Sequence, residues 1–229
     1  MSTSVRLLEA QSRYITFWHT LKKTGRHNIA APFLSVSDPE TLGGFRRPIL
    51  LVGQATRGCW FLQNFDTENT SSISEQIEER CETTRDFVTN PAFARRRASA
   101  FWRLRRVLKE EIGAPVIWTN LVKIGVLKDN PNWTFVREQQ ELAKLTLRAE
   151  IEHYSPSVVL LVTYLFGRLE VVVPLFSVDQ KAIERARNGY WSHLGNPGSP
   201  SLLWTRHPGR VRNEMLDSWV EEAVRLYQA

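Results

Sequence analysis

Four short apolar runs are spaced along the chain, each bounded by proline, glycine or serine. They are residues 48–52, 115–119, 157–162 and 201–205. Continuous apolar runs that do not alternate with polar residues are typical of strands covered on both faces, as in a parallel sheet between two helical layers. The pattern therefore predicts four parallel strands.

Between these runs, apolar residues recur at helical spacing, with charged residues on the opposite side. In residues 92–112, Phe101, Leu104 and Leu108 share one stripe, while Arg103 and Arg106 fall on the other side. Further helices are predicted at residues 5–21, 71–88, 135–153 and 213–227. The repeated strand-then-helix order predicts right-handed crossovers. We expect an α/β three-layer sandwich, with a central four-stranded parallel sheet flanked by helices.

The length of 229 residues suits one domain, and we treat residues 1–229 as such. The hydrophobic fraction of 42% and the charged fraction of 24% are those of a globular chain rather than a disordered or fibrous one. Thirty Lys and Arg against 24 Asp and Glu give a net charge of +6, which favours a polyanionic partner such as DNA or RNA.

The apolar positions near the N-terminus are interrupted by Arg13, His19 and Lys22. We therefore expect neither a secretion signal nor a membrane span, and a cytoplasmic location. The two cysteines, Cys59 and Cys81, are too few for a four-cysteine cluster or a cysteine-rich zinc site, and we expect free thiols.

Polar and glycine-containing segments directly follow three of the predicted strands. They are Gly53-Gln54-Ala55-Thr56-Arg57-Gly58, Asn120-Leu121-Val122-Lys123 and Arg206-His207-Pro208-Gly209. Ligands of doubly wound sheets bind at the carboxyl ends of the strands. We therefore expect these three segments to form one site.

In order and strand context, the three segments resemble the motifs of the uracil-DNA glycosylase superfamily. Members of that family carry a Gly-Gln or Gly-Glu loop after the first core strand, an Asn after the second and a His-Pro loop after the last. The resemblance spans residues 49–210. It implies a glycosylase that flips a base out of DNA and hydrolyses its N-glycosidic bond, leaving an abasic site. It also implies that no cofactor is needed.

The resemblance assigns roles to the matched residues. Gly53, Gln54 and Ala55 would lie beside the sugar and base. Asn120 would read the pyrimidine edge, a task that suits an amide because it offers both a donor and an acceptor. His207 would donate a hydrogen bond to the departing base as negative charge builds on it. Gln54, Asn120 and His207 are thus the candidate catalytic residues. Taken singly, each motif also has a structural explanation, because a Gly, an Asn or a His-Pro after a strand is common in turns and helix caps.

Other residues near the matched segments are candidates for contacts with the base or the DNA backbone. Arg57 is expected to hydrogen-bond a substituent on the base, and Phe65, with Trp60 and Phe61 as competitors, to stack on the flipped base. The expected DNA-binding residues are Lys123, Arg206, Gly209 (through its backbone amide), Arg210 and Arg212. The loop at residues 189–200 is a candidate wedge into the duplex.

The sequence also departs from the family pattern. Ala55 and Thr56 stand where the best-known branch has Asp-Pro, so the group that activates water is unassigned. Gly209 replaces the usual Ser of the His-Pro-Ser loop. Two cysteines exclude the four-cysteine iron–sulfur cluster of another branch. No lysine in the matched segments takes the place of an attacking amine, so no lyase activity is expected.

The altered first loop favours a modified pyrimidine as the substrate, such as the glucosylated hydroxymethylcytosine of phage DNA. In this respect the chain resembles anti-phage glycosylases that remove such bases. Uracil removal in base excision repair is the alternative within the family. Two alternatives lie outside DNA glycosylase activity. One is a catalytically inactive DNA-binding relative, and the other is a small-molecule nucleosidase or nucleotide-binding protein. In the favoured interpretation the protein is a monomer whose partner is DNA.

Overall fold

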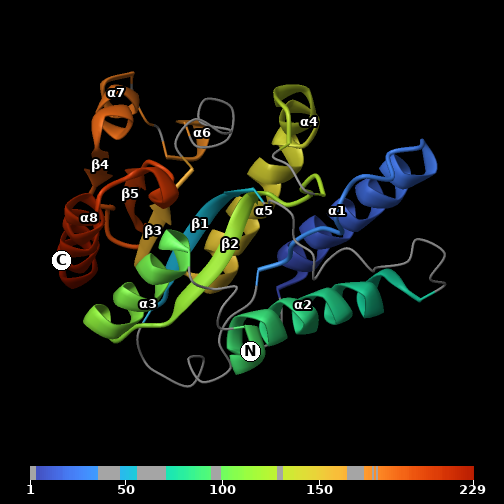
Figure 1. Ribbon diagram of the computed structural model, residues 1–229, viewed down its shortest axis with the longest axis horizontal. Coiled ribbons are helices and arrows are strands. Elements are labelled where there is room, and N and C mark those ends of the chain that lie inside the picture. The colour runs from blue at the N-terminus through green and yellow to red at the C-terminus, as the bar shows by residue number, and fades with distance from the viewer. Residues whose placement is uncertain are drawn as a thin grey trace.

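A five-stranded, mostly parallel sheet forms the centre of the computed structural model, with helices on both faces (Figure 1). The structure describes residues 4–35, 47–55, 71–93, 99–127, 131–163, 173–176, 178 and 180–229. The strands are β1 (Ile49–Ala55), β2 (Val116–Val122), β3 (Val158–Leu161), β4 (Tyr190–His193) and β5 (Ser201–Thr205). Their order across the sheet is β2-β1-β3-β5-β4.

The four predicted strands are β1, β2, β3 and β5, and they are parallel to one another as expected. The predicted number of four is wrong, because β4 adds an antiparallel strand at the edge next to β5. β4 lies in the segment expected to be a wedge loop. Tyr190 pairs with Thr205 and His193 with Leu202, so the turn from β4 to β5 lies at the amino ends of the parallel strands, away from the predicted site.

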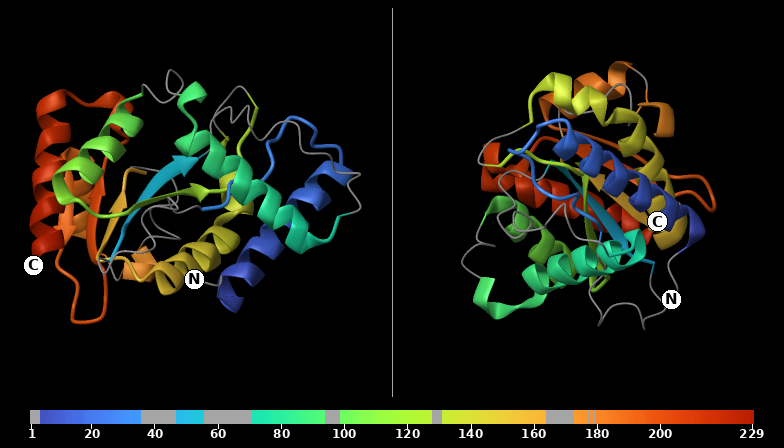
Figure 2. Two further views of the ribbon diagram at one scale, coloured as in Figure 1. Left: turned by 90° about the horizontal axis from the view of Figure 1, so that it is seen from below. Right: turned by 90° about the vertical axis from the view of Figure 1, so that its right-hand side faces the viewer.

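One face of the sheet is covered by α3 (Ala100–Ile112) and α8 (Asn213–Gln228), which pack beside each other (Figure 2). Leu51, Leu160 and Leu203 of the sheet meet Leu104 and Trp219 of these helices in one buried cluster. The helix predicted at residues 92–112 begins at Ala100, and residues 94–98 lie outside the described part of the chain. The helix predicted at 213–227 is confirmed.

The other face is covered by α5 (Gln140–Tyr154), α6 (Val173–Phe176) and α7 (Gln180–Asn188), with α4 (Trp133–Glu138) preceding α5. The single helix predicted at residues 135–153 is therefore two helices. The break falls at the fully buried Gln139, whose side-chain amide accepts from the Ile124 N–H and donates to the Ile124 carbonyl. These bonds tie the break to the chain that follows β2.

Two further helices lie near the β2 edge, α1 (Val5–Lys23) and α2 (Ile73–Thr89), and both were predicted. α1 packs on α5 and α2. α2 begins with a capping box in which Ser72 and Glu75 bond each other's backbone N–H groups, as such a sequence favours. No helix in the described ranges is long and apolar enough to span a membrane.

Candidate active site

Gly53 of β1 and Asn120 of β2 are register partners near the carboxyl ends of their strands. The Asn120 side chain is 4% exposed and folds over Gly53: a Cβ at Gly53 would lie 2.3 Å from Asn120 Oδ1. Glycine is needed here because the amide occupies the space that any side chain would take. Two of the three matched segments therefore meet directly.

The amide of Asn120 has a fixed orientation. The indole Nε1–H of Trp118 donates a hydrogen bond to Asn120 Oδ1 across 3.3 Å, and both side chains are buried. Because an indole nitrogen only donates, the amide atom that faces it must be the oxygen. Among the described residues, Nδ2 of Asn120 has no hydrogen-bond partner. A buried group of this kind usually has one, so Nδ2 is a donor that a ligand can satisfy.

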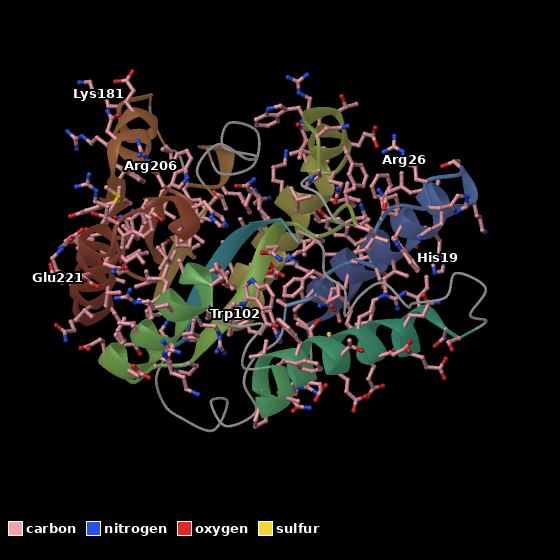
Figure 3. The ribbon with its side chains drawn as sticks, in the orientation of Figure 1. His19, Arg26, Trp102, Lys181, Arg206 and Glu221 are labelled. Carbon is pink, nitrogen blue, oxygen red and sulfur yellow. The ribbon has the colours of Figure 1, made fainter. Side chains whose placement is uncertain are left out.

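Aromatic rings surround Trp118. Its ring centroid lies 4.3 Å from that of Phe33, 4.8 Å from that of Trp102 and 5.6 Å from that of Phe101. Figure 3 shows Trp102 between α3 and α2. Phe101 also reaches Gly53, since a Cβ there would lie 3.5 Å from Phe101 Cε2. Phe101 is thus beside the candidate site, a role that its place on the apolar stripe of a helix did not reveal.

His207 follows β5 at the same edge of the sheet. Val52, Leu161 and Trp204 form one row across β1, β3 and β5. Gly53 comes directly after Val52 and His207 three residues after Trp204, so both lie at the carboxyl edge. β5 is separated from β1 by β3, and the described structure brings His207 to this edge rather than into contact with Asn120.

The ring of His207 is held by the turn that follows it, η5 (Pro208–Arg210). The Gly209 N–H donates to His207 Nδ1 across 3.2 Å. Since Nδ1 accepts, the proton of the neutral ring is on Nε2. A Cβ at Gly209 would lie 3.3 Å from Nδ1, so glycine leaves room for the ring. The Gly209 amide, expected to bind phosphate, is instead engaged by His207.

α3 connects the two parts of the edge. It contacts η5, and Arg103 donates a 2.6 Å hydrogen bond to Asn213 at the start of α8. Phe101 lies two residues before Arg103 in the same helix. The first turn of α3 therefore lies between the Asn120 amide and the His207 turn.

Lys123, expected to meet phosphate at the mouth of the site, lies instead in the core. It is 1% exposed, and its Nζ is 2.6 Å from Glu150 Oε1 and also bonds Thr119 Oγ1. Thr119 and Asn120 are successive strand residues and face opposite sides of the sheet, so Lys123 points towards α5, away from Asn120. Burial lowers the pKa of Lys123, and Glu150 opposes that effect.

For the other expected site residues, the structure gives a position in the chain and a degree of burial. Gln54 is half-buried in β1, next to the Gly53 and Asn120 pair. Ala55 ends β1 as the partner of Val122. Arg206 is half-buried after β5 (Figure 3) and Arg212 is exposed before α8. The structure does not describe the remaining expected residues Arg57, Trp60, Phe61 and Phe65, nor the side chains of Ala55 and Arg210.

The described residues contain no group of three or more His, Cys, Asp or Glu side chains that could hold a metal ion. The described residues at this edge offer the amide of Asn120, the ring of His207 and nearby aromatic rings. Neither a protein-family model nor a curated protein matches the sequence.

Proposed function

We propose that the protein is a monofunctional DNA glycosylase that turns one base out of DNA and hydrolyses its N-glycosidic bond, leaving an abasic site. The observation that carries this proposal is the direct meeting of Gly53 and Asn120 at the carboxyl edge of the sheet, with His207 at the same edge. This arrangement agrees with what the resemblance to the uracil-DNA glycosylase superfamily implies.

Asn120 reads the flipped base in this proposal. Among the described residues, nothing accepts a hydrogen bond from the buried Nδ2 group of Asn120. A base that accepts from Nδ2 would pair this donor, and the Phe101 ring beside Gly53 offers an apolar surface for the base.

His207 assists departure of the base. Because Nδ1 accepts from the Gly209 N–H, the N–H of the neutral ring is at Nε2. A donor of this kind stabilises the negative charge that develops on the base as the bond to the sugar breaks, and a single preorganised donor contributes roughly 10²–10³-fold to a rate. Water then adds at C1′ of the sugar: its hydroxyl stays on C1′ and its other proton is taken up by the departed base, so the products are an abasic site and the free base. No covalent intermediate with the protein is part of the proposal.

Arg206 and Arg212 flank the His207 turn and would contact the phosphates on either side of the flipped nucleotide. The net charge of +6 supports such a partner. We propose a modified pyrimidine, such as glucosylated hydroxymethylcytosine in phage DNA, as the substrate, and defence against such DNA as the setting.

A panel of DNAs tests the proposal. Purified protein is incubated with duplexes that contain uracil, hydroxymethylcytosine or glucosylated hydroxymethylcytosine, and with unmodified DNA, and alkali-labile sites are counted. We expect abasic sites in glucosylated DNA, with intact strands before alkali treatment. Cleavage of uracil DNA alone would contradict the proposed substrate. No abasic sites in any DNA, together with tight DNA binding, would indicate a non-catalytic binding protein.

A further inference from the structure

We propose that Trp133 and Arg137, on the exposed side of α4, form a second DNA-contact surface, called here the α4 surface. Trp133 stacks on a base in an unpaired stretch of the strand that carries the flipped nucleotide, and Arg137 binds the phosphates of that stretch. The inference rests on the proposed function and deepens it, because it makes DNA with a single-stranded stretch beside the target base the preferred substrate.

Trp133 differs in exposure from the other tryptophans. It is 47% exposed, whereas the other described tryptophans are buried or half-buried. A single exposed apolar side chain is common on protein surfaces and needs no partner. The anchoring of α4, its charges and its place in the fold are the features that give this ring one.

α4 holds Trp133 on a fixed backbone. At its start, Oδ1 of Asn132 accepts a hydrogen bond from the Phe135 N–H across 2.9 Å. Phe135 and Val136 are buried, and Gln139 fastens the other end of the helix. A ring presented from such a rigid element loses little conformational entropy when it binds.

The charges on this part of the molecule favour a polyanion. Arg26 bonds both oxygens of Glu138, at 2.6 and 2.9 Å, and Lys144 Nζ lies 2.8 Å from Glu141. Arg137 is exposed and forms no ion pair with another described residue. Since the carboxylates beside it are paired, its positive charge is left for phosphate. It follows the exposed ring by four residues, the spacing of neighbours on a helix.

The α4 surface lies on the side of the molecule that holds the candidate site. Figure 1 shows α4 beyond the carboxyl ends of β1 and β2. Val126, six residues after Asn120, lines a pocket of about 500 Å³ together with Asn132 and Thr134, the two neighbours of Trp133. Six residues span at most about 20 Å. That is the length of about six stacked nucleotides, so one strand can reach both places.

The features of the α4 surface suit a single strand better than a duplex. A stacking partner must offer the face of its ring, and in a duplex neighbouring base pairs cover both faces of each base, whereas an unpaired strand leaves them open. The pocket beside the ring adds the exposed His27 and Asn28, whose side chains bond no other described residue. These polar groups are available to the sugars and phosphates.

The test compares binding to an oligothymidine single strand of about 20 nucleotides with binding to a duplex of the same length, by fluorescence anisotropy. Trp133→Ala is expected to weaken single-strand binding by about tenfold, through loss of one stacked base, and duplex binding by less than about twofold. Trp133→Phe keeps a ring and should retain most of the affinity. Leu194→Ala is the matched control, because Leu194 is 50% exposed and follows β4 at the amino ends of the parallel strands. It should bind both DNAs as the wild type does.

The salt dependence tests the charge. Arg137→Gln should reduce the slope of log single-strand affinity against log salt by about 0.7, the value for one phosphate contact. Arg148→Gln, an exposed arginine of α5, should leave the slope unchanged. An unchanged slope in Arg137→Gln would remove Arg137 from the α4 surface and overturn that part of the inference.

The outcomes separate the two proposals. Equal single-strand affinities of the wild type and Trp133→Ala overturn the inference, as does a loss of the same size on the duplex. Abasic-site formation at saturating protein is measured in parallel, and Trp133→Ala should match the wild-type rate. Excision with unchanged affinity leaves the glycosylase function standing without the α4 surface. No excision by the wild type, with a tenfold loss of single-strand affinity in Trp133→Ala, rejects the glycosylase function and retains the surface as that of a DNA-binding protein.

Discussion

The amide oxygen of Asn120 lies 2.3 Å from the point where a Cβ on Gly53 would stand. A contact this short cannot persist, so any side chain at position 53 displaces the amide. The two residues are register partners on adjacent strands and come from segments 67 positions apart in the sequence, as their numbers 53 and 120 show. The relationship ties the first matched segment to the amide that we propose reads the base.

Gly53→Ala is expected to lower the rate of base excision by at least tenfold, because the methyl group pushes the Asn120 amide off Trp118. Overpacking at a buried position also costs roughly 1–3 kcal/mol of the free energy of unfolding. Urea unfolding and single-turnover excision measure the two effects. Gly189→Ala is the control, since a Cβ there meets nothing within 4 Å. A Gly53→Ala protein with wild-type activity would show that the Asn120 geometry is irrelevant.

Lys123 is expected to support folding rather than DNA binding. Lys123→Met leaves the Glu150 carboxylate buried without its cation, and removing one partner of a buried pair costs about 3–5 kcal/mol. Lys144→Met breaks the exposed pair with Glu141 and should cost less than about 1 kcal/mol. Urea denaturation compares the two variants. Similar small losses in both would contradict the importance of the buried pair.

Arg206 and Arg212 are expected to contact phosphate. Replacing either with alanine should weaken DNA binding and reduce the slope of log affinity against log salt by about 1. Arg148 is the control, because it is exposed on α5, towards the end of the helix that leads into the amino end of β3. Fluorescence anisotropy at several salt concentrations measures the slopes. An unchanged slope in the Arg206 and Arg212 variants would exclude them from the DNA interface.

Stability is expected to fall in alkaline solution partly through Cys81. Burial raises the pKa of its thiol to about 11, from 9.0 in the unfolded chain. Between these values the unfolded state loses a proton that the folded state keeps, so the contribution is present below pH 9 and is lost as the pH rises towards 11. From pH 8 to pH 10 the wild type should lose about 1 kcal/mol more than Cys81→Ala. Equal losses in urea unfolding would contradict this.

The sequence predicted the strands and helices that an apolar pattern marks. The four parallel strands were found because their residues are continuously apolar. β4 was missed because Tyr190–His193 is a four-residue edge strand with exposed and half-buried positions, which no apolar run marks. The break at Gln139 was missed because it depends on hydrogen bonds to Ile124, a contact that helical periodicity does not contain.

The candidate site was predicted in part. The positions of Gly53, Asn120 and His207 at one edge follow from parallel strand order, and the structure has them there. Lys123 was misplaced because it was interpreted as part of a loop at the mouth of the site. Alternation along β2, continued to Lys123 three positions after Asn120, places it on the opposite face, with Thr119 and Glu150. Trp118 and Phe101 were interpreted as core residues, and only their contacts with Asn120 and Gly53 distinguish them from other buried aromatics.

The central claim is that the chain excises a base with the help of His207. The most direct measurement is the single-turnover rate of abasic-site formation in glucosylated hydroxymethylcytosine DNA for the wild type, for His207→Ala and for His193→Ala, an exposed histidine on β4. We predict that His207→Ala is slower by roughly 10²–10³-fold with DNA affinity retained, and that His193→Ala matches the wild type. Equal rates for the wild type and His207→Ala, or no abasic sites from the wild type, would contradict the claim.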